Sequence, residues 1–188
     1  MSAPPIYPRT IIKMVQMLSL EGSQDSALIK FVLLLVLNVG ARSTEVAHII
    51  LDSMRFDSEF KCVAGELPQT KSSKVKIFSI QAGVNRFFCW FLAFADFLCL
   101  CERPLWEPIE LDDECEDEFV PKPKDFRMPN WLVPALQYTK YPGTKIGNWI
   151  KELRPLEKGG SKRFAKFCVS DLPDCPSAAG IRHGAFAR

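Results

Sequence analysis

An almost wholly apolar run at residues 31–39, closed by Gly40, constrains the fold of this chain more than any other feature. Residues 27–29 are also apolar, with Lys30 between them and the run, and we predict a buried helix over residues 27–39. Glycine adopts a left-handed conformation without strain and is favoured just past the last turn of a helix, so Gly40 is the predicted stop. A helix over residues 10–20 is predicted before it, and residues 22–25 form the break.

The pattern of apolar and polar residues then changes. Ser43 or Thr44 is suited to cap a short third helix that reaches about residue 51. After it, apolar and polar residues alternate over residues 54–56, 60–67 and 75–80, with β-branched and aromatic members. This pattern predicts three short strands of a small antiparallel sheet, and it places Lys71 in the tip between the last two strands.

The second half of the chain predicts further helices. Residues 81–101 suggest a long helix that is buried on most sides, and residues 130–134 re-enter the core. Between them, residues 104–129 are acidic and then proline-rich, which predicts a surface insertion with little fixed structure. Helices are also expected over residues 144–153 and 161–169, with Lys162, Arg163 and Lys166 on one side of the latter, and from Pro176 onward. The predicted fold class is α+β, mainly helical, with residues 1–26 as an N-terminal segment and helix and residues 27–188 as the main domain.

The composition excludes several classes of protein. A chain of 188 residues can bury one good core. It contains no apolar stretch of the roughly 18–20 residues that span a membrane, and its N-terminus does not resemble a signal peptide. Its seven cysteines include no C-x-x-C pair, and His48 and His183 stand apart, so we expect reduced thiols in an intracellular protein rather than a zinc site or a disulfide framework.

The charges are unevenly distributed along the chain. Residues 107–118 hold eight acidic residues and no basic one, whereas residues 119–188 hold thirteen Lys and Arg against five Asp and Glu. This basic segment fits a face that binds a polyanion, although a solvated surface explains it nearly as well.

Three basic residues stand at positions suited to grip one phosphate. Arg42 follows the predicted stop at Gly40, Lys71 lies in the predicted hairpin tip, and Arg182 lies near the start of the last predicted helix. Guanidinium groups present a planar fork that matches two phosphate oxygens. We therefore treat these three residues as candidate site residues.

Their surroundings resemble the catalytic domain of the tyrosine recombinases, the phage-integrase family. In that family, an apolar helix is followed by G-x-R-x-x-E, a lysine lies in the turn before the third strand, and an H-x-x-R box opens a helix of small and apolar residues. The matching segments here are residues 33–46, 69–77 and 179–187, and the likeness covers residues 27–188. A finer similarity, to the recombinases of eukaryotic cryptons and DIRS-like elements, rests on residues 148–151 and 182–185.

This resemblance implies a specific chemistry and specific partners. Arg42 and Arg182 would hold the phosphate of double-stranded DNA in the transition state, Lys71 would protonate the leaving oxygen as general acid, and a tyrosine would attack. Glu45 would orient Arg42 by an ion pair or support the site indirectly. The family uses no metal or cofactor, and other recombinase subunits are further partners. No membrane is implied, and the expected location is intracellular, the nucleus in a eukaryote.

The sequence departs from the family pattern in two places. Ala179 stands where the box has its histidine, and His183 is a poor substitute because the neighbouring position points to another side of a helix. Tyr7, Tyr138 and Tyr141 all precede Arg182, so none takes the place of the nucleophile. From these departures we expect a domain that is truncated before its tyrosine and inactive alone, and that also lacks the separate N-terminal DNA-binding domain usual in the family.

Two other classes remain open at this stage. One is a relic of a recombinase that binds DNA or a protein without cutting, and the other is an unrelated helical interaction domain in which the boxes are coincidence. Taken singly, Arg42 fits a surface residue after a helix end, Glu45 a structural carboxylate, and Arg182 a surface helix residue. Lys74 and Lys76 are rivals to Lys71, although their positions lie within the predicted strand.

Overall fold

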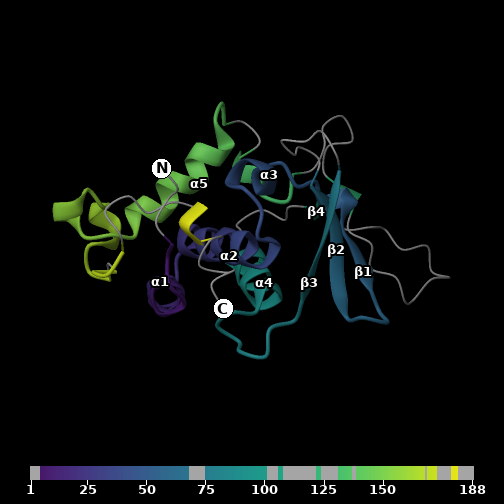
Figure 1. The fold of residues 1–188 in the computed structure, drawn as a ribbon, viewed down its shortest axis with the longest axis horizontal. Helices are drawn as coiled ribbons and strands as arrows, with labels where there is room; N and C mark the ends of the chain where they lie inside the picture. The colour runs from purple at the N-terminus through teal and green to yellow at the C-terminus, as the bar shows by residue number, and fades with distance from the viewer. Residues whose placement is uncertain are drawn as a thin grey trace.

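The computed structural model describes residues 5–67, 75–100, 106–107, 122–123, 131–136, 139–167, 169–172 and 179–181. Figure 1 shows the helices on one side of the molecule and a small sheet on the other. The α-helices are α1 Pro8–Glu21, α2 Gln24–Val39, α3 Ser43–Ala47, α4 Trp90–Leu100 and α5 Pro142–Glu152. The strands are β1 Arg55–Asp57, β2 Cys62–Leu67, β3 Lys76–Gln81, β4 Trp106–Glu107 and β5 Lys122–Pro123, and 3₁₀ turns lie at Leu51–Ser53, Pro134–Leu136, Leu156–Lys158 and Lys162–Phe164.

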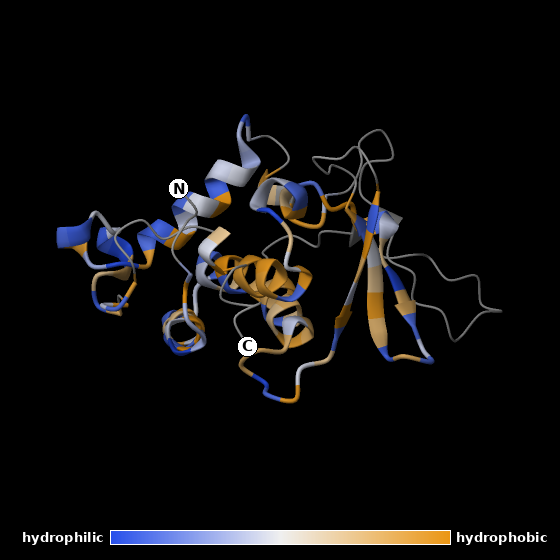
Figure 2. Ribbon diagram, viewed as in Figure 1, coloured by the Kyte–Doolittle hydropathy of each residue, from blue (hydrophilic) through white to orange (hydrophobic). Residues whose placement is uncertain are grey.

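Helix α2 is the centre of the core. It contacts α1, α3, α4, α5 and β3, and most of its ribbon is hydrophobic (Figure 2). Its Phe31 is fully buried, with the ring centroid 5.5 Å from that of Trp90, 5.0 Å from Phe94 and 5.6 Å from Phe97. The prediction of a buried helix that ends at Gly40 is confirmed, and Gly40 has the left-handed φ of 64°.

The helix begins three residues earlier than predicted, because Ser23 caps it. The Ser23 hydroxyl accepts a hydrogen bond from the amide of Ser26 at 3.2 Å. Arg163 ties this loop to the 3₁₀ turn at Lys162–Phe164 by contacts with Ser23, Glu21 and Asp25. Burial acts to raise the pKa of Glu21, but hydrogen bonds from Ser23 and Ser26 and the charge of Arg163 together lower it. The loop is therefore held by charged groups as well as by its cap.

The sheet has the predicted form. Its strands run antiparallel in the order β1-β2-β3, with Phe56 opposite Val63 and Val63 opposite Ile80. Along β3, Phe78 and Ile80 are buried, whereas their neighbours Ile77 and Ser79 are exposed, as expected for a sheet with one face on the core.

Helix α4 corrects the prediction of a long helix over residues 81–101. The chain turns first: the Asn85 side chain accepts a hydrogen bond from the amide of Phe87 at 2.9 Å, and the Asn85 carbonyl accepts one from Phe88 at 2.9 Å. Asparagine competes in this way with helical hydrogen bonding, so the helix starts only at Trp90. Helix α4 is also not buried on most sides, since Trp90, Ala93 and Phe97 are its buried residues and the rest of its surface is half-buried or exposed.

Two other predicted helices are shorter in the structure. The described residues of 161–169 form one 3₁₀ turn, and the Val169 amide donates to the Leu153 carbonyl at 2.9 Å, which draws the chain out of a helix. Helix α3 ends at Ala47 rather than near residue 51, because Ile50 pairs with Trp131 in an antiparallel bridge. The predicted return of residues 130–134 to the core is confirmed at Leu132 and Val133, which are both buried.

Much of residues 104–129, the predicted insertion, lies outside the described residues. Its described part is the antiparallel pair of β4 and β5. In the described ranges no helix is long and apolar enough to cross a membrane.

Candidate functional site

Arg42 lies at the junction between the central helix and α3. The Gly40 amide donates to the Val36 carbonyl at 3.1 Å, which closes α2, and the chain then turns through the buried Ala41. Arg42 occupies the N-cap position of α3 with extended backbone angles (φ −70°, ψ 150°). Neither Ser43 nor Thr44 caps this helix, contrary to the prediction.

Glu45 supplies the missing cap from within the helix. One of its carboxylate oxygens accepts the Arg42 amide hydrogen at 2.8 Å, and the other lies 3.0 Å from Nη1 of the Arg42 guanidinium. The first contact satisfies an amide that a helix N-terminus leaves without a helical partner. The second places a guanidinium beside a carboxylate whose side chain is only 5% exposed, so the buried acidic group has an oppositely charged partner.

This arrangement leaves the arginine oriented and accessible. The Arg42 side chain is 47% exposed, and within the described ranges Glu45 is its acidic partner. A guanidinium carries five N–H donors, and the contact with Glu45 uses one of them. The others can donate to the oxygens of an anion that approaches from solvent.

Helix α5 supports α3 from the other side through a close approach at Gly143. A Cβ atom at Gly143 would lie 2.5 Å from Thr44 Cγ2 and 3.0 Å from the Thr44 amide nitrogen. At the far end of α3, Nδ1 of the His48 ring donates a hydrogen bond to the Thr44 carbonyl (2.6 Å), and the ring centroid lies 4.9 Å from that of Trp131. The helix that carries Arg42 and Glu45 is thus held by packing at both ends.

We predict that Gly143→Ala lowers the free energy of unfolding by about 2 kcal/mol, because the methyl group must push the Thr44 backbone away. Gly147→Ala is the matched control in the same helix. A Cβ at Gly147 meets no atom within 4 Å, so this change should raise stability by about 0.5–1 kcal/mol through helix propensity. Urea unfolding followed by circular dichroism measures both, and equal effects of the two variants would contradict the close approach.

The other candidate residues lie outside the described residues. These are Lys71, Arg182 and His183, together with the rival Lys74. The described chain leaves β2 at Leu67 and returns at Val75, and residues 179–181 are helical just before Arg182. Ala179 is half-buried in that turn, and Lys76 lies in β3 with an exposed side chain. The structure therefore brings Arg42 and Glu45 together and does not place the remaining three.

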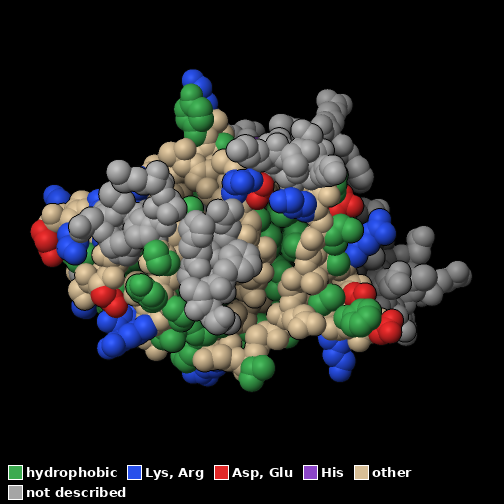
Figure 3. Space-filling view, viewed as in Figure 1, with side chains coloured by type: hydrophobic (Ala, Val, Ile, Leu, Met, Phe, Trp, Pro, Cys, Tyr) green, Lys and Arg blue, Asp and Glu red, His purple; other side chains and the backbone are tan. Residues whose placement is uncertain are grey.

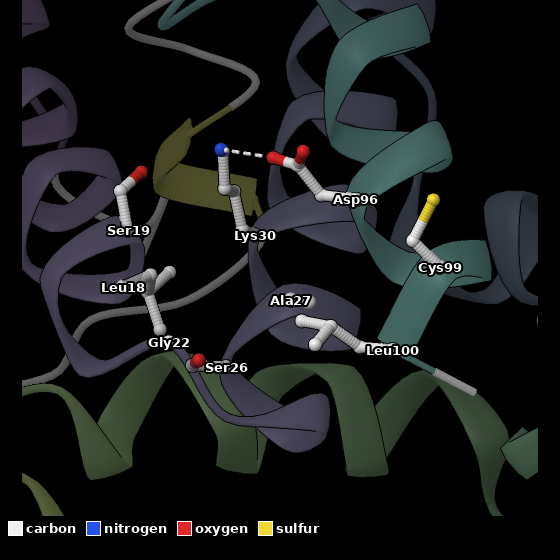
Figure 4. Close-up of a pocket in the computed structure, with 9 residues that line it drawn as sticks. All are labelled: Leu18, Ser19, Gly22, Ser26, Ala27, Lys30, Asp96, Cys99 and Leu100. Atoms are coloured by element: carbon white, nitrogen blue, oxygen red, sulfur yellow. Dashed lines mark hydrogen bonds and ion pairs between the residues drawn. The ribbon is translucent and has the colours of Figure 1, made fainter. Parts of the chain in front are cut away.

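Sequence reasoning missed an ion pair between a buried lysine and an exposed aspartate. Lys30 of α2 lies 2.9 Å from Asp96 of α4, with 10% of the lysine side chain exposed and 55% of the aspartate side chain. Both line a cavity of about 370 Å³ between α1, α2 and α4 (Figure 4). The signal in the sequence is a lone charge within the apolar helix, since lysine is almost never buried without a partner.

We predict unequal effects for the two halves of this pair. Asp96→Ala should lower the free energy of unfolding by about 2 kcal/mol, because it leaves a buried ammonium without its acceptor. Lys30→Met should change it by less than about 0.5 kcal/mol, because Asp96 stays solvated and the methionine packs in the core. Chemical unfolding of both variants measures the difference, and a larger loss for Lys30→Met would show that the pair itself is the stabilising element.

The basic side chains do not gather in one place on the face that Figure 3 shows. Lysines and arginines are spread around it, with hydrophobic side chains between them. In the part of the chain that the structure describes, no three His, Cys, Asp or Glu side chains lie close enough to hold a metal ion. The site is therefore defined by the oriented Arg42 and not by a broad charged patch.

The fold has a solved counterpart. No protein-family model matches the chain, and no curated protein matches it. The structure named FLP Recombinase-Holliday Junction Complex I contains a chain that is similar over 93% of the present chain, with a TM-score of 0.54 and 11% sequence identity. The present chain spans 38% of the length of that chain. The predicted mainly helical α+β fold with a three-stranded antiparallel sheet is confirmed, and it is shared with the recombinase of that structure.

Proposed function

We propose that this chain binds double-stranded DNA as a domain of the tyrosine-recombinase type, with Arg42, Lys71 and Arg182 gripping the phosphate at which strands are exchanged. The observation that carries the proposal is the Arg42–Glu45 pair: a half-exposed guanidinium held by a buried carboxylate, within a fold shared with a recombinase. The name of that neighbour states that it was bound to a Holliday junction. A four-way DNA junction is therefore a natural ligand to test beside a linear duplex.

In this proposal the arginines stabilise charge that builds up on the phosphate during transfer. Arg42 is suited to that part because Glu45 holds Nη1 of its guanidinium while 47% of the arginine side chain stays exposed. Lys71 would act as general acid toward the leaving oxygen, and Glu45 keeps Arg42 in place. No metal or cofactor takes part in this scheme.

A second candidate is a relic of such a domain that binds DNA without cutting it. The observation that favours it is Ala179, which lies in the turn before Arg182 and cannot donate the hydrogen bond that a histidine would. The 188 residues contain no tyrosine after Arg182, so we propose that they do not cut DNA by themselves. Origin in a mobile element of the crypton or DIRS type, and a nuclear location, belong to the same proposal.

We predict that Arg42→Ala weakens binding to a fluorescent duplex or Holliday junction about tenfold and lowers the slope of log affinity against log salt by about one. Arg9→Ala is the matched control, because it removes the same charge from an exposed position on α1. Fluorescence anisotropy over a salt series measures both. Equal losses for the two variants would show that Arg42 acts only through net charge and would remove the phosphate site from the proposal.

Nicked duplex DNA separates the two candidates. A covalent protein–DNA complex that survives denaturation would show strand transfer, with a nucleophile from this chain or another subunit. If binding is salt-sensitive and depends on Arg42 but no such complex forms, the result favours the second candidate, a domain that binds DNA without cutting it.

A further inference from the structure

We propose that the N-terminal segment, residues 5–13, positions Arg182 by fixing the chain at both ends of the stretch that leads into it. The inference rests on the proposed function, because it takes Arg182 as the second arginine of the proposed phosphate-binding site. Its evidence lies in described residues on either side: Ile6, Thr10 and Lys13 on one, and Asp171 and residues 179–181 on the other.

The first fixed point lies directly before Arg182. The Ile6 amide donates a hydrogen bond to the Gly180 carbonyl at 2.9 Å. The Ile6 and Ile181 side chains are almost fully buried and belong to the same core. In Figure 1 the purple start of the chain accordingly meets the yellow turn at residues 179–181. Arg182 follows Ile181 in the chain, so a shift of this turn carries the backbone of Arg182 with it.

The second fixed point is Asp171. Thr10 Oγ1 and Lys13 Nζ both donate to its Oδ2, each at 3.3 Å. Burial acts to raise the pKa of Asp171, but hydrogen bonds from its own amide, Lys13 and Thr10 and the charge of Lys13 together lower it. Asp171 is therefore ionised at neutral pH, where DNA binding would be measured, and both contacts are in place.

The same segment is also tied to the first arginine. Helix α1 begins in this segment and continues to Glu21, and its packing against α2 buries Ile11 within the segment and Met14, Val15 and Leu18 beyond it. Helix α2 ends at Val39 and is capped by Gly40, two residues before Arg42. The N-terminal segment thus bridges the two parts of the chain that carry Arg42 and Arg182, which lie far apart in sequence.

The test is a set of double-mutant cycles in DNA binding. Ile6→Ala removes the side chain under the turn, and Tyr7→Ala, at a neighbouring residue that is 64% exposed, is the matched control. We expect Ile6→Ala to weaken DNA binding about tenfold in the parent chain and in the Arg42→Ala background. In the Arg182→Ala background the loss should be less than about twofold, because the contact of Arg182 with the phosphate is already absent. Tyr7→Ala should change affinity by less than about twofold in every background.

A merely structural role gives another pattern. If Ile6→Ala weakens binding by the same factor in all three backgrounds, Ile6 stabilises the fold in general and the inference is wrong. If Arg182→Ala itself leaves the affinity unchanged, the proposed function is wrong at that residue, whatever Ile6 does. The two failures are therefore distinct.

Thr10→Val serves as a milder variant should Ile6→Ala not fold. It keeps the shape of the side chain and removes the hydrogen bond to Asp171. We expect a loss of about threefold in affinity with the same dependence on background. Circular dichroism at the assay temperature confirms that each variant is folded, and an equal loss in Arg182→Ala would overturn the inference.

Discussion

Replacing Phe31 by alanine is expected to lower the free energy of unfolding by about 4 kcal/mol. Phe31 is fully buried in the middle of α2, and its ring lies against those of Trp90, Phe94 and Phe97 of α4. The substitution removes the buried ring and leaves a cavity that the surrounding helices can fill only in part. It also removes aromatic contacts that join the two helices. Urea unfolding, monitored by Trp fluorescence and by circular dichroism, measures the loss.

Leu92→Ala is the control for this prediction. Leu92 lies on the same helix as the aromatic partners, but its side chain is half-exposed. Its loss should be below about 1 kcal/mol. If the two substitutions gave similar losses, the contact between α2 and α4 would not be the centre of the core.

The second large effect is expected at Glu45. Glu45→Ala should lower the free energy of unfolding by about 3 kcal/mol, because the Arg42 amide loses its acceptor and a buried charged hydrogen bond is removed. It should also weaken DNA binding about as much as Arg42→Ala does, about tenfold, since the guanidinium is no longer oriented. Chemical unfolding and fluorescence anisotropy provide the two readings.

Two further variants define the role of Glu45. Glu45→Gln keeps an oxygen for the Arg42 amide but loses the charge, so its stability loss should be about 1 kcal/mol, whereas the loss of DNA affinity should remain. Glu66→Ala removes an exposed carboxylate from β2 and should change stability by less than about 0.5 kcal/mol. Full DNA affinity in Glu45→Ala would contradict the orienting role and leave Glu45 as a structural cap.

Local sequence patterns correctly predicted those helices and strands whose conformation depends mainly on their own residues. Helix α2 and its stop at Gly40 follow from composition and from the preference of glycine for a left-handed cap. The three strands follow from alternation, because one face of the sheet is buried. Two helices were predicted too long, at residues 81–101 and 161–169, because a single contact competes with the helix in each. The Asn85 side chain delays the start of the first helix, and the Val169–Leu153 hydrogen bond draws the chain out of the second.

The sequence predicted which residues belong to the candidate site but not how they contact one another. The structure shows these contacts for the site residues that it describes. The sequence marked Arg42 and Glu45, three residues apart, but it assigned the cap to Ser43 or Thr44. The structure shows that Glu45 holds both the amide and the guanidinium of Arg42. Sequence spacing cannot distinguish these arrangements, because several side chains near a helix start are able to accept the same amide.

The sequence by itself determined the order of the first three helices and of the three-stranded sheet, the central apolar helix and the position of Arg42 just beyond its end. Only the tertiary structure decided that Lys30 pairs with Asp96, that Gly143 must stay small against Thr44, and that Ile6 meets Gly180. The reason is physical: caps, turns and periodicity depend on neighbours in the chain, whereas these contacts join residues 66, 99 and 174 positions apart (96 − 30, 143 − 44 and 180 − 6). They exist only after the core has brought α1, α4 and α5 around α2.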